Sequence, residues 1–326
     1  MTAQKMTLGK AINAGLRAAM EADPKVVLAG EDIGKLGGVF RITEGLQKDF
    51  GEARVLDSPL AESGIAGTAM GLAMRGYRPV IEVQFDGFVF PAFDQIVSQW
   101  AKMHNRTLGK VRTPLVLRLP FGGGIGAVEH HSESPEVYFA HTAGLKVVSP
   151  SNPHDAYWMI QQAIASDDPV VFLEPKRRYH DKGEVDTDAS PRSMYEAVVT
   201  RPGKDLTLLT YGPMVKTCLQ AAEAAAEEGN ELEVVDLRSV SPIDMPVVLE
   251  SVRRTGRAVV VHEAPRSFSV SSEIAARLTE ELFYDMESPV LRVTGYDLPY
   301  PPSRVETQYL PDLDRVLDAV DRSLAY

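Results

Sequence analysis

Residues 57–96 read DSPLAESGIAGTAMGLAMRGYRPVIEVQFDGFVFPAFDQI, and this stretch decides the fold expected for the chain. Glu62 directly precedes a run of glycine and alanine residues, which predicts a helix whose backbone can approach another helix closely. A strand at 79–83 follows, and its end is rich in aromatic side chains. One carboxylate beside several aromatic rings suits an aromatic heterocycle that must be stacked and protonated.

Composition limits the class of protein further. The chain has 326 residues, which corresponds to about two domains at ~150 residues each. Its net charge of −11 argues against nucleic-acid binding, which needs a basic face, and is typical of a solvated acidic surface. Cys218 is the only cysteine, so neither an internal disulfide nor a thiolate metal cluster is expected. We find no apolar run of membrane-spanning length and no targeting segment, and we therefore expect a cytoplasmic protein.

Short β-branched runs alternate with longer helical patterns, which predicts an α/β fold with two parallel-sheet domains. We expect a first domain at 1–175, a charged linker at 176–195 and a second domain at 196–326. Expected strands are 26–29 (the first of the chain), 55–56, 79–83, 115–119, 145–149, 170–173, 206–211, 232–236, 258–261 and 290–293. Expected helices are 7–20 (capped by Thr7), 91–102, 153–165, 215–228, 245–254, 271–283 and 313–324.

A glycine-rich segment at 121–127 contains a formal match to the dinucleotide-binding fingerprint. That fingerprint requires a helix to open there, whereas Pro135 and a polar loop follow, so we expect the glycines to allow close backbone approach instead. His130 and His131 lie in this loop, either as solvated side chains or as a proton shuttle near neutral pH. A zinc site is disfavoured, because adjacent histidines lack a ligand spacing and no third ligand is near.

Each of these features also has an ordinary structural explanation. A carboxylate such as Glu62 in the first turn of a helix interacts favourably with the helix dipole. Phe85, Phe88, Phe90 and Phe93 would fit a hydrophobic core. Their occurrence together and in this order favours a binding site.

The whole chain resembles the β subunits of the E1 component of 2-oxo acid dehydrogenase complexes, in the transketolase-like thiamine diphosphate superfamily. The matching segments occur in family order and span both expected domains: Gly30–Asp32, Gly37–Phe40, Pro59–Glu62, Glu82–Phe85, Phe90–Ile96, His131–Glu136, Glu174–Lys176 and His262–Pro265. The resemblance implies an N-terminal pyrimidine-binding thiamine diphosphate fold and a transketolase C-terminal-like domain.

The resemblance also implies a role for individual residues. Glu62 would contact N1′ of the aminopyrimidine, Phe88 would stack on that ring, and the pocket would be lined by Leu60, Gln84 and Phe85. His131 would act on the substrate carboxylate and on acyl transfer to a lipoyl group.

The partners follow from the same resemblance. The superfamily holds Mg²⁺ and the diphosphate with a Gly-Asp-Gly segment, and this sequence contains none. The family places that half-site on a separate α subunit in an α2β2 heterotetramer, which delivers its product to a lipoyl-bearing E2 acyltransferase. A structural K⁺ of the family would map to Leu115, Ala163, Ile164, Ser166 and Asp168.

The sequences after His131 (Ser-Glu-Ser-Pro-Glu) and at Pro59–Glu62 resemble those of members that act on branched-chain 2-oxo acids, with pyruvate or acetoin members as the alternative. Outside enzymes, the alternative is a non-catalytic α/β scaffold subunit, against which Glu62 and His131 argue together. One departure concerns residues 267–269, Ser-Phe-Ser, where the family usually has a Gly-Gly pair.

Overall fold

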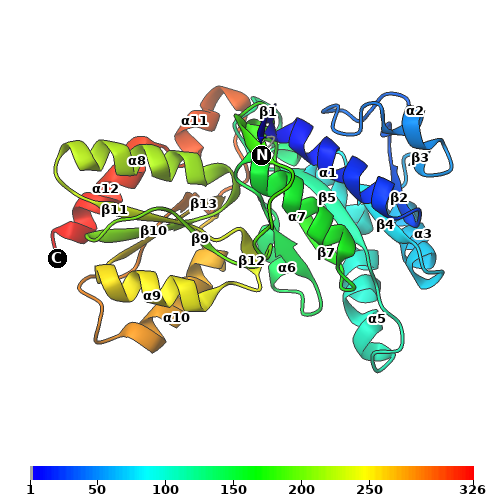
Figure 1. Cartoon of the computed structure of the whole chain (residues 1–326). Helices are drawn as coiled ribbons and strands as arrows, with labels where there is room; N and C mark the ends of the chain where they lie inside the picture. Colours follow the sequence, from blue (N-terminus) through cyan, green and yellow to red (C-terminus); the bar gives the residue numbers. More distant parts are fainter. Residues whose placement is uncertain (1–2) are drawn as a thin grey trace.

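The computed structural model describes residues 3–326, which form two α/β units side by side (Figure 1). The start of the chain, from which the absence of a targeting segment was inferred, lies partly outside these residues. The first unit has a seven-stranded sheet in the order β12-β6-β7-β5-β4-β2-β3, parallel except for β12. Its strands are β2 (Val26–Gly30), β3 (Val55–Asp57), β4 (Arg78–Glu82), β5 (Val116–Phe121), β6 (Lys146–Val148), β7 (Val170–Pro175) and β12 (Ser239–Ser241).

Helices cover both faces of this sheet. On one face α1 and α7 pack together, and α3 with the segment that follows β4 packs on the other. The helices of this unit are α1 (Leu8–Ala22), α2 (Leu46–Phe50), α3 (Glu62–Met74), α4 (Phe90–Asp94), α5 (Ala101–Arg106), α6 (Glu136–Ala140) and α7 (Pro153–Ala165). Every residue of β2, β5 and β7 is buried, which explains their apolar sequences without alternation.

The second unit has a five-stranded sheet in the order β14-β13-β10-β11-β9, parallel except for β9. In Figure 1, α8 and α12 cover one face of it, and α9 and α10 cover the other. Its elements are β9 (Val198–Arg201), β10 (Leu206–Thr210), α8 (Val215–Glu227), β11 (Leu232–Asp236), α9 (Met245–Thr255), β13 (Ala258–Pro265), α10 (Val270–Leu282), β14 (Leu291–Gly295), α11 (Glu306–Tyr309) and α12 (Leu313–Leu324). The predicted class, two α/β units with mainly parallel sheets, is confirmed.

Local signals at helix ends agree with the structure. The Thr7 hydroxyl accepts a hydrogen bond from the Lys10 amide at 3.2 Å and caps α1 as predicted. The helix expected at 91–102 is more complex, because a π-helical segment, Gln95–Trp100, joins α4 to α5. The Trp100 indole nitrogen at the end of that segment donates to the Ala66 carbonyl of α3 at 3.1 Å. This contact fixes the wider turn against the small-residue helix.

One predicted feature of the strand order is wrong. The first strand is β1 (Ala3–Thr7), not Val26–Ala29, and it pairs antiparallel with β8 (Lys182–Asp186) inside the segment expected as a linker. Both strands are short, largely polar and largely exposed, so neither carries an apolar pattern that sequence reading could detect.

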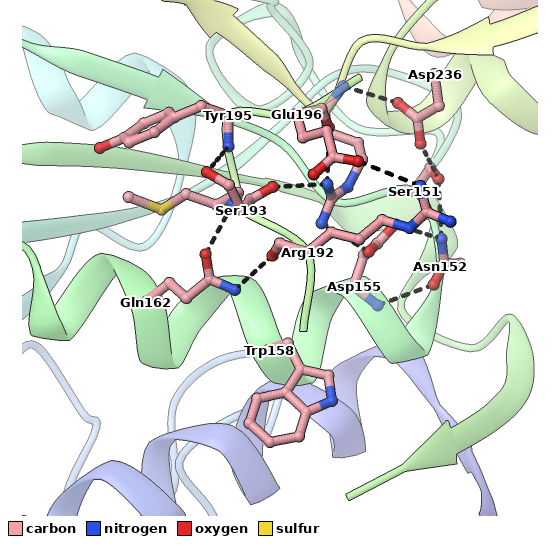
Figure 2. Close-up of polar contacts among 12 residues, drawn as sticks. Ser151, Asn152, Asp155, Trp158, Gln162, Arg192, Ser193, Tyr195, Glu196 and Asp236 are labelled. Carbon is pink, nitrogen blue, oxygen red and sulfur yellow. Dashed lines mark hydrogen bonds and ion pairs between the residues drawn. The ribbon is translucent and has the colours of Figure 1, made fainter. Parts of the chain in front are cut away.

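The rest of the connecting segment is held by side chains from both units (Figure 2). Gln162 of α7 receives a hydrogen bond from the Met194 amide at 2.7 Å and donates to the Arg192 carbonyl at 2.8 Å. Arg238 of the second unit donates to the Ser193 carbonyl at 2.8 Å and forms an ion pair with Asp155 of α7. The connection is therefore packed between the units. No helix within residues 3–326 is long and apolar enough to cross a membrane.

Candidate cofactor-binding site

Glu62 is the first residue of α3, directly after β3 and the turn that follows it. Its side chain is only 9% exposed, yet in residues 3–326 we find no hydrogen-bond or ion-pair partner for its carboxylate. A buried carboxylate without a partner is costly, so this group is suited to bind a donor from outside the chain.

The glycine-rich face of α3 is also open. A side chain added at Gly71 would meet no atom within 4 Å, and Gly64 would meet only Ala61 of its own turn. The expected close approach to another helix therefore does not occur at these two glycines within this chain.

A second acid lies beside Glu62 and was not predicted as a site residue. Glu31 follows β2, and its Oε1 atom is buried without a partner among the described residues. Burial raises the pKa of Glu31, and the nearby Glu62 carboxylate raises it further. The Gln84 amide donates to the Glu31 carbonyl and to the Asp32 carboxylate, both at 3.3 Å. Glu31 lies in a segment that resembles the family, but its burial depends on contacts distant in sequence.

The aromatic residues after β4 gather around His131. The Phe85 ring stacks on the His131 imidazole with 3.8 Å between centroids and 13° between planes. Phe88 meets the same imidazole edge to face at 5.0 Å, and Phe40 meets Phe85 in the same manner at 5.4 Å. The structure thus brings three predicted site residues into direct contact, whereas Leu60 is 81% exposed.

The hydrogen bonds of His131 define its tautomer. Its Nδ1 atom lies 2.8 Å from the His130 carbonyl oxygen, which can only accept, so Nδ1 carries the proton. In the neutral imidazole the Nε2 atom is then the acceptor, and no donor in the described part of the chain reaches it. His130 differs, because its Nδ1 lies 3.4 Å from Glu129 and its ring is not stacked on Phe85. It meets the His131 ring edge to face at 4.3 Å and lies 5.9 Å from the Phe88 ring.

Buried ion pairs lie beneath the site. Arg118 of β5 donates to Glu82 at 2.6 Å and to Glu174 at 2.7 Å, from the two neighbouring strands. Lys176 donates to Asp86 at 2.6 Å. These pairs fix the ends of β4, β5 and β7, from which the site loops emerge. These ion pairs were not predicted from the sequence, because contacts between side chains on different strands leave no local sequence pattern.

The glycine-rich segment does not open a nucleotide-binding helix. A short 3-10 turn, Glu129–His131, follows it, as the position of Pro135 indicated. Gly87 lies directly under this turn, and a Cβ atom there would stand 2.5 Å from the His130 carbonyl oxygen. The glycine therefore lets the aromatic segment and the histidine loop approach each other closely.

The residues suggested for K⁺ lie away from this cluster, at the ends of α7 and β5. The Arg78 guanidinium donates to the Ile164 and Ser166 carbonyls at 3.0 Å, and Asp167 pairs with that guanidinium. The Leu115 carbonyl accepts a hydrogen bond from the Val170 amide, and the Ala163 carbonyl accepts one from the Ser166 amide. The Asp168 carbonyl accepts one from the Ser166 hydroxyl. Each of these carbonyl oxygens keeps a second lone pair with which it could bind a cation. The K⁺ site stays a prediction.

Comparison with known proteins agrees with this architecture. The family model of the transketolase pyrimidine-binding domain matches residues 4–182, and that of the transketolase C-terminal domain matches residues 195–316. The solved structure of a split-gene transketolase, described as an inactive β4 tetramer, superposes with a TM-score of 0.82 over 98% of both chains. At 23% identity this likeness concerns the fold.

Two relatives are closer in sequence. The pyruvate dehydrogenase E1 component subunit beta of Leifsonia xyli subsp. xyli is 62% identical over 99% of this chain and 96% of its own length. The 3-methyl-2-oxobutanoate dehydrogenase subunit beta of Mycobacterium tuberculosis (strain ATCC 25618 / H37Rv) is 54% identical over 98% of this chain and 92% of its own length. The chain has a transketolase-like fold of two α/β domains. It belongs to the thiamine diphosphate-dependent family of E1 β subunits of 2-oxo acid dehydrogenases.

Proposed function

We propose that this chain provides the pyrimidine half of a thiamine diphosphate site and that an α subunit provides the diphosphate half with Mg²⁺. The Glu62 carboxylate at the start of α3, for which residues 3–326 supply no hydrogen-bond or ion-pair partner, carries this proposal. It fits the N1′ atom of an aminopyrimidine, and the open glycine face of α3 beside it fits a second subunit. We further propose that the two subunits form an α2β2 heterotetramer in the cytoplasm, which transfers its acyl product to a lipoyl-bearing E2.

When bound, the cofactor supplies a nucleophilic carbon and an electron sink for decarboxylation of a 2-oxo acid. Glu62 would hold a proton at N1′, and the exocyclic nitrogen of the bound pyrimidine would then supply a base. Phe88 stacks on the pyrimidine, and Gln84 and Phe85 line its pocket. His131 would act on the substrate carboxylate and assist transfer of the acyl group to lipoyl, with its Nδ1 atom held by the His130 carbonyl.

The side chain of the substrate is the finer part of the proposal. The resemblance of the segment around His131 to branched-chain members, and the 54% identical relative named for 3-methyl-2-oxobutanoate, support a branched-chain 2-oxo acid. Pyruvate is the second candidate, because the 62% identical relative carries the name of a pyruvate dehydrogenase subunit. Both acids present the same 2-oxo carboxylate, so they differ only in the apolar volume that the assembled site must hold.

Reconstitution tests this proposal. The αβ complex is expected to decarboxylate 2-oxo acids and to acylate a lipoyl domain, with 3-methyl-2-oxobutanoate giving a higher kcat/KM than pyruvate. The chain alone is expected to bind thiamine diphosphate weakly in calorimetry, since it lacks the Mg²⁺ and diphosphate ligands. Tight, Mg²⁺-dependent binding by the lone chain would contradict the split site, and a preference for pyruvate would reverse the substrate assignment.

A structural K⁺ is the remaining part of the proposal, through the carbonyls of Leu115, Ala163, Ile164, Ser166 and Asp168. Potassium at about a hundred times its Kd would stabilise the folded state by ~2.7 kcal/mol. The Tm of the αβ complex should then be higher by a few degrees in KCl than in choline chloride of equal ionic strength. Equal Tm values in the two salts would exclude this site.

A further inference from the structure

The loop that carries His131 is held by carboxylates from the second unit. The Gly124 amide donates to Oε1 of Glu306 at 2.8 Å, and the Gly126 amide donates to Oε2 of the same residue at 3.0 Å. The Gly123 amide donates to Glu263 at 2.9 Å. Three N–H groups within four residues therefore end on carboxylates that lie 140 to 182 positions away in the sequence.

The backbone conformation explains why this segment is rich in glycine. Gly122, Gly124 and Gly126 have φ angles of +82°, +89° and +71°, which side-chain-bearing residues rarely adopt. These conformations let the backbone N–H groups of residues 123, 124 and 126 reach carboxylates of the second unit. The glycines that resemble a dinucleotide fingerprint therefore serve contacts to two carboxylates of the same chain.

Glu306 itself is firmly placed. Its side chain is 6% exposed, and the Tyr300 hydroxyl donates to its Oε1 atom at 2.6 Å. Both oxygens are thus used, one by two donors and the other by one. A carboxylate that accepts two hydrogen bonds fixes the orientation of a loop as well as its distance from the carboxylate, because both N–H groups must point at its oxygens.

The opposite end of the loop is fixed by the first unit. The Glu133 amide donates to Asp86 at 2.7 Å, and the Glu133 carbonyl accepts from the Gly122 amide at 2.8 Å. Asp86 is in turn paired with the buried Lys176. Residues 127–132, with His131 stacked on Phe85, therefore lie between two fixed points.

We propose that Glu306 is a positioning residue for His131, through which the second unit sets the geometry of acyl transfer. This inference rests on the proposed function of His131. Replacing Glu306 by glutamine removes one acceptor, because the amide –NH2 faces one of the two glycine N–H groups. The loop then loses one of its fixed contacts while the side-chain volume is kept.

The Glu306→Gln αβ complex is expected to acylate a lipoyl domain about 10- to 100-fold more slowly, the range for misplacement of a reacting group by up to ~1 Å. In a His131→Ala background the same change should cost less than about twofold, since residues acting through one another are not additive. Glu233→Gln is the matched control. Glu233 is equally buried in the second unit and contacts Arg254 and Ser251, not the loop.

Two outcomes would overturn the assignment. One is the same fold-loss with and without His131, which indicates a general structural effect. The other is unchanged hydrogen exchange at the Gly124 and Gly126 amides in Glu306→Gln, where faster exchange than in Glu233→Gln is expected. A wild-type complex that does not acylate lipoyl would contradict the proposed function instead, and the exchange measurement would still decide whether Glu306 holds the loop.

Discussion

Replacement of Glu62 by glutamine is expected to lower turnover of the αβ complex by ~10²–10⁴-fold, the usual loss when a general acid–base group is removed. The amide cannot exchange a proton with the pyrimidine, although it keeps the shape of the carboxyl group. Cofactor affinity should fall much less, because stacking and the diphosphate contacts are unchanged. Steady-state decarboxylation with an artificial electron acceptor, together with a cofactor titration, measures both quantities.

Glu223→Gln provides the matched control, since Glu223 is an exposed glutamate on α8 and should leave turnover unchanged. Near-normal turnover of Glu62→Gln would refute the assignment of Glu62. A loss confined to cofactor affinity would make Glu62 a binding group rather than an acid–base group. The adjacent Glu31, whose pKa is raised by burial and by Glu62, is the residue to test next in that case.

Elements with strong local signals could be predicted from the sequence. The predicted helix 153–165 matches α7 at both ends, because Asn152 caps it and Pro153 fits its first turn. Buried parallel strands such as β2 and β7 could also be predicted, because each is a short apolar run. The domain limits at 175 and 196 stay a prediction. The strand β12 lies within residues 196–326 but pairs with β6, so this part of the chain contributes a strand to the sheet of the first unit.

Features that depend on distant contacts could not be predicted. The strands β1 and β8 stabilise each other across about 180 residues without any apolar pattern in either. The same holds in the candidate site, where Glu62 was predicted from its local context but Glu31 and Glu306 were not. Burial of Glu31 and the bonds from Gly124 and Gly126 to Glu306 exist only in the folded chain.

His131→Ala is expected to impair acylation of a lipoyl domain strongly, by an amount comparable to the loss at Glu62. Among the described residues nothing hydrogen-bonds to the Nε2 atom of His131, and Phe85 holds its ring in one orientation. Removal of the imidazole therefore removes a placed proton-transfer group. The assay is reductive acylation by the reconstituted αβ complex, run beside decarboxylation with an artificial acceptor.

His130→Ala is the internal control, because His130 lies one residue away and its side chain is 49% exposed. Loss of such a side chain usually changes stability by no more than ~0.5 kcal/mol, and acylation should change little. Equal losses in both variants would mean that the loop acts as a unit rather than through one imidazole. A larger loss for His130 would transfer the role to that residue and break the argument from the Phe85 stack, because only His131 lies face to face with that ring.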